Sequence, residues 1–274
     1  MSSAQYDADF FARHDDSGAR AAAVILGILE AYFKPHSVVD VGCGSGRWLA
    51  ECQRLFDSRV LGLDGDWNTT ISSTGIPFKH VNLEDQLPEV GEFDLAICLE
   101  VAEHLTATAA DNLIASLISM APVVLFSAAI EEQPGEHHIN CMWQHEWMEK
   151  FEKLGYRCLD VIRPQIWHNQ EVAWWYKQNV FLAVRPGSEI LSSGIVEQSS
   201  MNPTDVVHPE NYVSTIQGHF RVAKETWARL EAAEKRLNSP NLTDLKDMSL
   251  CYVRRIVRYL VKLVKSGVGK VGES

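Results

Sequence analysis

The chain has 274 residues, 46% of them hydrophobic, which is enough to bury a full α/β core. Residues 1–213 carry 13 lysines and arginines against 30 aspartates and glutamates, a net charge of −17, whereas residues 214–274 carry 12 against 6, a net charge of +6. An acidic body of this kind repels polyanions, so nucleic acid is an unfavourable partner for residues 1–213.

The N-terminal sequence MSSAQYDADFFARHDD is acidic and lacks the apolar core of a signal peptide. No apolar run reaches the roughly 18 residues that suggest a membrane span. The six cysteines are scattered without a C-x-x-C pair, as expected for reduced thiols. These features predict a cytoplasmic protein without disulfides.

Strands and helices alternate along the first two thirds of the sequence. Apolar spacing predicts helices at 18–34, 47–56, 111–121 and 143–156. Short apolar runs predict strands at 37–41, 59–64, 78–83, 93–100, 123–129, 157–163 and 172–184. Alternation of this kind indicates an α/β fold with a parallel sheet and helical crossovers.

The remaining third of the sequence changes character. Residues 185–213 are rich in Ser, Gly and Pro and predict an irregular connector. Residues 214–274 form a basic helical extension, with two predicted helices separated by the sequence NSPN at residues 238–241. The sequence therefore predicts one domain over residues 1–184, a connector, and a helical C-terminal extension.

A glycine-rich turn follows the first predicted strand in the sequence VVDVGCGSGRW. Gly42, Gly44 and Gly46 stand at alternate positions, where glycine lets backbone amides approach a ligand and the next helix adds positive potential. The G-x-G-x-G spacing differs from the dinucleotide fingerprint G-x-G-x-x-G, which argues against NAD. A purely structural turn is an equally good interpretation of the glycines alone.

Two acidic residues accompany this turn. Asp40 ends the first strand, and Asp64 ends the next strand, at the distance where a ribose diol is held in nucleotide-binding folds. Each has an ordinary alternative, because Asp40 can cap the turn and Asp64 can be a loop acid. Their joint occurrence in this order favours a cofactor site.

These motifs together resemble the class I S-adenosylmethionine-dependent methyltransferases over residues 37–184. The resemblance implies a methyltransferase domain at 1–184, with a Rossmann-like, seven-stranded, mostly parallel sheet whose antiparallel last strand is 172–184. It also implies S-adenosylmethionine as the cofactor. The residues implied to bind it are Asp40, Gly42, Cys43, Gly44 and Gly46 for the methionine part, Asp64 and Gly65 for the ribose, Trp67, Asn82 and Leu83 for the adenine, and Leu99 beside the methyl group.

The stretch CLEVAEHL, residues 98–105, places Glu100, Glu103 and His104 directly after a buried strand. If the chain turns helical there, these positions share one face and their side chains converge. His137 and His138 follow the strand 123–129 at the same carboxyl edge of the sheet, where α/β folds bind ligands. Two carboxylates and two imidazoles suffice for a divalent cation, with imidazoles favouring Mn²⁺, Co²⁺ or Zn²⁺ over Mg²⁺.

The cluster also has an interpretation without metal. Glu103 then is an acid in the first turn of a helix, His104 is a partly buried imidazole, and one histidine acts as a general base. Both interpretations remain open from the residues alone.

The motif E-x-x-E-H resembles two metal-using groups, the ubiquinone-biosynthesis O-methyltransferases and the Hen-type small-RNA 2′-O-methyltransferases. The resemblance implies Glu100, Glu103, His104 and a later histidine, taken as His138 rather than His137, as ligands of Mg²⁺ or Mn²⁺. We assign the catalytic roles to His104, His138 and Glu100. The acidic body disfavours RNA as the acceptor, despite the second resemblance.

The function expected from the sequence is O-methylation of a hydroxyl on a small molecule, sugar or glycan. The alternatives are N-methylation of a small amine, 2′-O-methylation at an RNA 3′ end, and a non-catalytic cofactor-binding scaffold. Six aromatic residues are candidates for the wall of an acceptor pocket, although most, and Trp174 above all, are expected in the core. They are Trp143, Trp147, Trp167, Trp174, Trp175 and Tyr176.

The sequence VRRIVRYLVKLVK at residues 253–265 alternates cations and apolar residues at helical spacing. This pattern fits an anionic membrane surface or a partner groove, and so a peripheral position at the inner face of a membrane. It equally fits a helix packed on its own body or on a second subunit of a homo-oligomer, which is the more common use of an amphipathic helix.

Overall fold

A computed structural model describes residues 8–65, 75–199 and 204–238, together with Tyr252, Arg255 and Arg258; side chains are described from Ser17 to Lys235 within these ranges and at those three positions. The chain divides into two compact units, residues 1–215 and residues 216–274. The first unit contains the sheet and all of the residues that line the pocket described below.

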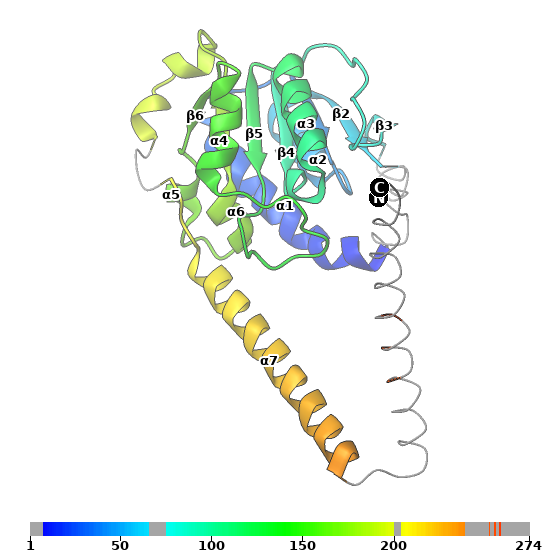
Figure 1. Cartoon of the computed structure of the whole chain (residues 1–274). Helices are drawn as coiled ribbons and strands as arrows, with labels where there is room; N and C mark the ends of the chain where they lie inside the picture. The colour runs from blue at the N-terminus through cyan, green and yellow to red at the C-terminus, as the bar shows by residue number, and fades with distance from the viewer. Residues whose placement is uncertain are drawn as a thin grey trace, which may run out of the picture. The chain divides into compact units, whose positions relative to one another are not determined.

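The first unit is built on a seven-stranded sheet with the order β3-β2-β1-β4-β5-β7-β6 (Figure 1). Neighbouring strands from β3 to β5 are parallel, whereas β7 runs antiparallel to both β5 and β6. The predicted Rossmann-like sheet with an antiparallel last strand is confirmed. The strands are β1 Ser37–Val41, β2 Arg59–Asp64, β3 Phe78–His80, β4 Leu95–Leu99, β5 Val123–Ser127, β6 Arg157–Leu159 and β7 Phe181–Val184.

Helices cover both faces of this sheet. In Figure 1, α3 and α4 lie on the face toward the viewer, and α1 lies behind the sheet. The α-helices are α1 Ala8–Glu30, α2 Arg47–Phe56, α3 Ala107–Met120, α4 Gln144–Lys153, α5 Arg163–Ile166, α6 Trp174–Asn179 and α7 Pro209–Asn238, and the short 3₁₀ helices are η2 Ala102–His104, η3 Glu189–Ser192 and η4 Val196–Gln198.

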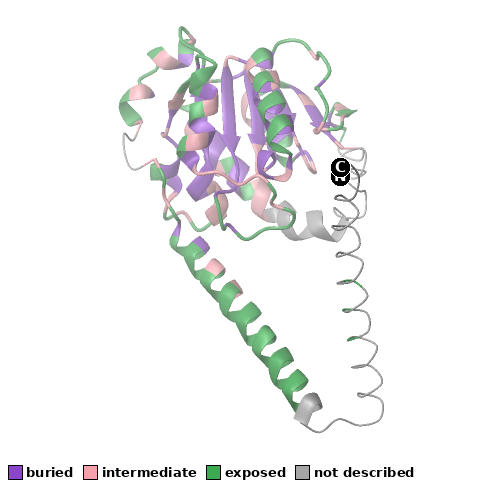
Figure 2. Cartoon of the chain, in the orientation of Figure 1, coloured by how far each residue is buried: buried purple, intermediate pink, exposed green. Residues whose placement is uncertain are grey.

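The core consists of two hydrophobic layers, one on each face of the sheet (Figure 2). Side chains alternate between the layers along each strand, so Leu95 and Ile97 contribute to the layer that includes Leu26 of α1, whereas Ala96 and Cys98 contribute to the other. Burial on both faces explains why the strands are apolar runs without polar alternation.

The segment 172–184 corrects one prediction, because only its last four residues form a strand. Residues Trp174–Asn179 form α6, and β7 begins at Phe181. The aromatic residues suggested a strand because Trp and Tyr favour β structure. Buried polar side chains at the end of α6 hydrogen-bond to other elements, and this tertiary network overrides the local preference.

Other predicted strands are present but shorter. β3 ends at His80 rather than at residue 83, and β6 ends at Leu159 rather than at residue 163, where α5 begins. The connector 185–199 is not featureless, because it contains η3 and η4, and its Ile190 and Ile195 are buried in the core. α7 begins at Pro209, before the predicted start of the extension.

Almost all of the predicted second C-terminal helix lies outside the described residues. Within it the structure describes only Tyr252, Arg255 and Arg258, which are helical and exposed. Among the described residues, no helix has the length and apolar content needed to cross a membrane.

The sheet order itself creates a place for a ligand. The chain moves outward from β1 through β2 to β3 and then returns to β4 on the other side of β1. Loops leaving the carboxyl ends of β1 and β4 therefore diverge, and a crevice opens between them. The glycine-rich turn follows β1, and Glu100 follows β4, so both lie at this crevice.

Candidate active site

The glycine-rich turn forms a tight cradle between β1 and α2. Gly42, Gly44 and Gly46 all have positive φ angles, of 80°, 52° and 78°. A Cβ atom at Gly42 would overlap the side chain of Val101, so this position requires glycine for space as well as for conformation. The amide of Gly44 donates to Oδ2 of Asp64 over 2.7 Å, which fixes the turn against the end of β2.

Asp40 and Asp64 have different surroundings. Oδ2 of Asp40, which is 3% exposed, has no hydrogen-bond partner among the described residues, and burial followed by the charge of Asp64 raises its pKa well above the usual value. Asp64 accepts one amide hydrogen bond on each oxygen, from Gly44 and Gly65, both at 2.7 Å. Of these two carboxylates, Asp40 therefore has the buried oxygen without a partner among the described residues, and a cationic amino group of a ligand fits it.

A pocket of about 380 Å³ extends from this cradle to the end of β4. Its lining combines the glycine turn, the loop after β4, the loop after β5 and the start of α6. The lining residues are Ser17, Gly18, Asp40, Gly42, Cys43, Gly44, Ser45, Arg47, Trp48, Leu99, Glu100, Glu103, His104, Gln133, Pro134, Gly135, Glu136, His138, Trp174, Trp175 and Tyr176.

Five of the predicted cofactor residues lie in this lining, namely Asp40, Gly42, Cys43, Gly44 and Leu99, whereas five others do not. Gly46, Asp64, Gly65, Asn82 and Leu83 are outside it. Asn82 is exposed in a turn, where its side chain accepts from the amide of Glu84 and donates to Asp85. Trp67 lies outside the described residues.

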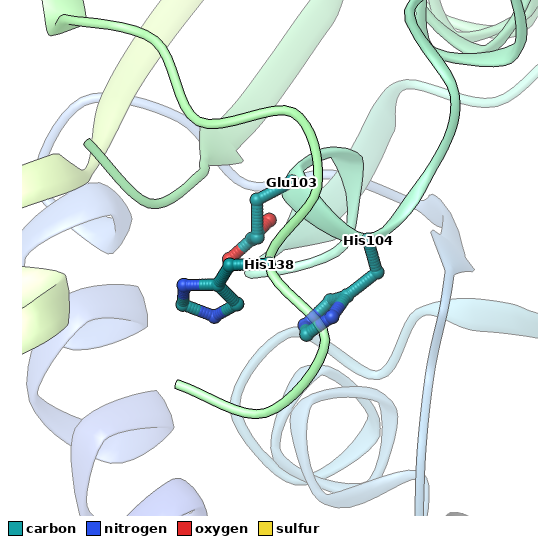
Figure 3. Close-up of side chains that lie close together, drawn as sticks. All are labelled: Glu103, His104 and His138. Carbon is teal, nitrogen blue, oxygen red and sulfur yellow. The ribbon is translucent and has the colours of Figure 1, made fainter. Parts of the chain in front are cut away.

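The backbone of the stretch CLEVAEHL differs from the helix expected from the sequence. Glu100 is not helical, because its φ angle is +56°, and only Ala102–His104 form a short 3₁₀ helix. The predicted helical face is therefore wrong, although all three side chains line the pocket. His138 joins Glu103 and His104 in a cluster whose potential ligand atoms lie within 4.8 Å of one another (Figure 3). His137 and Glu100 are outside this cluster.

Glu103 is the most unusual member of the cluster. It is 0% exposed, and neither carboxylate oxygen makes a hydrogen bond of good geometry to a described residue. Burial raises its pKa well above the usual value, and the neighbouring Glu100 raises it further, while the amides of Glu103 and Ala129 lie close enough to oppose the rise. A charged carboxylate in this position needs a proton or a cation.

The two imidazoles are held as neutral bases. Burial, together with the charge of the neighbouring His138, lowers the pKa of His104 to about 4, and burial also lowers the pKa of His138. Nδ1 of His138 lies 3.1 Å from the carbonyl oxygen of Gln133 and must donate to it, because a carbonyl only accepts. Nε2 of His138 therefore keeps its lone pair, which suits it for a metal ion or a proton.

Glu100 accepts hydrogen bonds of good geometry from side-chain amides, and Glu103 does not. Nδ2 of Asn179 donates to its two oxygens at 3.2 and 3.4 Å, and Nε2 of Gln133 donates to Oε2 at 3.3 Å. Burial raises the pKa of Glu100, and these hydrogen bonds oppose the rise. The two carboxylates are only three residues apart, yet their environments differ.

The amide donors are oriented by a buried network that sequence motifs did not reveal. Nε2 of Gln178, which is 0% exposed, donates to Gln133 and to Asn179, and its Oε1 accepts from the amide of His208 and from Nδ2 of Asn211, both at 2.9 Å. The only signal in the sequence was the polar QN pair at the centre of an apolar run. This network connects the first turn of α7 to Glu100.

Three aromatic residues at the start of α6 also line the pocket. Trp174, predicted in the core, is half-buried on the pocket wall together with Trp175 and Tyr176. The ring of Tyr176 meets that of Trp48 edge to face, with centroids 5.5 Å apart. Trp147, in contrast, is buried in the core beside Phe126, as most of the tryptophans were expected to be.

Residues 11–181 match the family model described as "Methyltransferase domain". The chain belongs to this family. It is a class I S-adenosylmethionine-dependent methyltransferase, in agreement with the sheet order and with the glycine cradle at the end of β1. No curated protein is similar enough in sequence to count as a match.

Solved structures share the fold at low sequence identity. The sugar N-methyltransferase KedS8 from a Streptoalloteichus species is 15% identical, with a TM-score of 0.52 over 68% of this chain and 95% of that chain. Streptomyces venezuelae DesVI is 15% identical, with a TM-score of 0.50 over 65% and 96%. An O-methyltransferase family protein from Burkholderia thailandensis is 13% identical, with a TM-score of 0.50. The match covers 65% of the present chain but only 57% of the Burkholderia protein.

We predict that Gly42→Ala abolishes tight binding of S-adenosylmethionine. The added Cβ overlaps Val101, so the turn must move away from the pocket, and we expect affinity to fall at least about tenfold. Isothermal titration calorimetry measures this change. Gly91→Ala is the matched control, because Gly91 has a φ of +88° but open space around it and lies outside the pocket; equal losses for both variants would contradict the prediction.

We predict that Gln178→Leu, which nearly conserves side-chain volume, destabilises the fold by about 3 kcal/mol or more, because it leaves buried donors of His208 and Asn211 without an acceptor. Urea unfolding measures the change. Gln198→Leu is the control, since Gln198 is exposed and its replacement should change stability by less than about 0.5 kcal/mol. A similar small change at Gln178 would show that the network contributes little.

Proposed function

We propose that this methyltransferase transfers the methyl group to a hydroxyl of a small molecule or sugar, and that Glu103, His104 and His138 hold a divalent cation beside the acceptor. The observation that carries the proposal is the fully buried Glu103 carboxylate, which has no hydrogen-bond partner of good geometry among the described residues and faces two neutral imidazoles.

The donor set fits a transition metal. A buried, unpaired carboxylate is costly unless a proton or a cation compensates its charge. One carboxylate and two imidazoles favour Mn²⁺, Co²⁺ or Zn²⁺ over Mg²⁺. When bound, such a cation lowers the pKa of the acceptor hydroxyl. This lowering helps O-methylation, because the acceptor oxygen loses its proton as it attacks the methyl group.

The loop after β5 presents His138 for this role. The carbonyl of Gln133 orients the ring, and Gly135 leaves space for it, because a Cβ atom at Gly135 would overlap the imidazole. Glu100, held by its amide donors, lies beside the cluster and can accept a hydrogen bond from a second hydroxyl of the acceptor. These residues orient an acceptor that carries neighbouring hydroxyls.

The lining supports a neutral acceptor. Glu100, Glu103 and Glu136 line the pocket, whereas Arg47 is its one lysine or arginine among the described residues. Trp174, Trp175 and Tyr176 add apolar rings with polar tips, which suit the mixed surface of a sugar. A phosphorylated acceptor or a nucleic acid meets repulsion from these carboxylates.

N-methylation of an amino sugar is the second candidate. The acidic lining also attracts a protonated amine, and one protein of the same fold, KedS8, is named as a sugar N-methyltransferase. In that case Nε2 of His138 acts as the base that takes the proton from the amine, and no metal is needed.

The test supplies purified protein and labelled S-adenosylmethionine with separate pools of sugars and hydroxylated metabolites, amines and RNA. We expect label in the hydroxyl pool, a decrease of at least about 100-fold with chelator, and recovery with Mn²⁺. Methyl transfer that is insensitive to chelator would exclude a role for metal in the reaction. Label in the amine pool would favour the second candidate, and label in RNA would contradict the argument from charge.

Two variants separate the metal site from the general acidity of the pocket. Glu103→Gln keeps the shape of the side chain but removes its charge, so Mn²⁺ binding should be lost while S-adenosylmethionine affinity is retained. Glu136→Gln is the matched control, because Glu136 lines the pocket but does not belong to the cluster. Mn²⁺ binding that survives in Glu103→Gln would exclude Glu103 as a ligand.

A further inference from the structure

The second unit contains an apolar stripe that is left uncovered along α7. Ile216, Phe220, Trp227 and Leu230 are 37%, 72%, 66% and 59% exposed. With the small Ala223 they stand at alternating intervals of four and three residues, the spacing of a helix that packs against another helix. Figure 2 shows that α7 is exposed over most of its described length, and a row of large exposed apolar side chains of this kind indicates an interaction surface.

The chain continues beyond α7 with a segment that carries the same spacing. After Asn238 it runs for a further 36 residues, and the sequence NSPN at 238–241 is a turn signal. Apolar residues then recur at intervals of three and four, as Leu250, Val253, Val257, Leu260 and Val264. Tyr252, Arg255 and Arg258, which lie between these positions, are described as helical.

The two stripes are mirror images about Pro240. Leu230 and Leu250 stand at equal distances from it, and the same is true of each successive pair. The remaining pairs are Trp227 with Val253, Ala223 with Val257, Phe220 with Leu260, and Ile216 with Val264. Both stripes span 15 residues, roughly 21 Å of helix between the first and the last. An antiparallel hairpin that turns at residues 238–241 therefore brings every stripe position of α7 opposite an apolar residue.

We propose that residues 242–265 form a helix that packs antiparallel along the exposed stripe of α7, making residues 216–265 a helical hairpin. This proposal does not depend on the acceptor or on a metal. The short link gives the segment a high effective concentration at α7, which a separate molecule lacks.

Charge supports the same chain as the occupant, rather than a second copy. The α7 stripe continues to Glu234, and the mirror position is Lys246, so the hairpin places opposite charges together. A parallel pair of α7 helices would instead place two Glu234 side chains against each other, which is unfavourable.

A membrane surface is a weaker occupant. It would take up the apolar face of 242–265 but would leave the α7 stripe exposed, whereas the hairpin covers both. In the hairpin, helical spacing places Arg255, Arg258 and Lys262 on the side of the second helix away from α7, with Arg254 and Lys265 at its flanks.

The test is disulfide trapping in the full chain with Cys251→Ser as the background. Ala223→Cys with Val257→Cys places two thiols at a mirror pair, close enough for a bond in the hairpin. Ala223→Cys with Arg258→Cys is the control, with nearly the same loop length but the second thiol on the basic face. After mild oxidation, gel mobility without reductant and peptide mass spectrometry measure intrachain bonds.

We expect the intrachain bond to form at least about tenfold faster for the 223–257 pair than for the 223–258 pair. Equal rates for the two pairs, or no bond in either, would overturn the proposal. Interchain bonds through Ala223→Cys alone would assign the stripe to a second copy. Sedimentation of the full chain with phosphatidylglycerol vesicles, accompanied by loss of the 223–257 bond, would assign the second helix to a membrane.

Discussion

The parallel pairing of β1 with β4 is the constraint on which the active site depends. Asp40 pairs with Ile97 in this register, so the two strands end at the same edge of the sheet. The chain reaches β4 only after building β2 and β3 on the other side, and the loops at the two ends are therefore forced apart. The glycine cradle and Glu100 face each other because of this topology, although nearly 60 residues separate them in the sequence.

Two carboxylates with the same chemistry acquire different properties at this edge. Glu100 accepts hydrogen bonds from Asn179 and Gln133, whereas Glu103 is more deeply buried and lacks such donors. Environments that separate the protonation behaviour of neighbouring acids are typical of sites that perform acid and base chemistry. The donors on Glu100 depend on Gln178 and, through it, on Asn211, which lies beyond the residues 11–181 that match the family model. The first turn of α7 is thus part of the active-site architecture.

The sequence predicted the features that depend on local pattern. Apolar runs between glycine and proline signals located every strand of the sheet, and the ligand-binding edge followed from the strand order of the resembling family. The segment 174–179 was misread because its aromatic residues favour strands locally, while the hydrogen bonds of Gln178 and Asn179 are long-range. Adjacent His137 and His138 are equivalent by pattern. The structure distinguishes them by the carbonyl of Gln133, by the space at Gly135 and by the positive φ angle of His137, none of which is visible in spacing.

The cluster of carboxylate side chains at this pocket affects the energy of the methyl-transfer reaction. S-adenosylmethionine carries a positive sulfonium, and that charge disappears as the methyl group leaves. Carboxylates that line the pocket, such as Asp40, Glu100 and Glu103, stabilise the cationic cofactor more than the transition state, in which the charge is already dispersed, and this opposes catalysis. A proton or a cation bound to the Glu103 carboxylate neutralises its negative charge, and so removes one of these charges from the acceptor side of the pocket. The lack of well-oriented donors to Glu103, beside the well-bonded Glu100, is therefore consistent with a site in which only one of the two carboxylates keeps its charge during transfer.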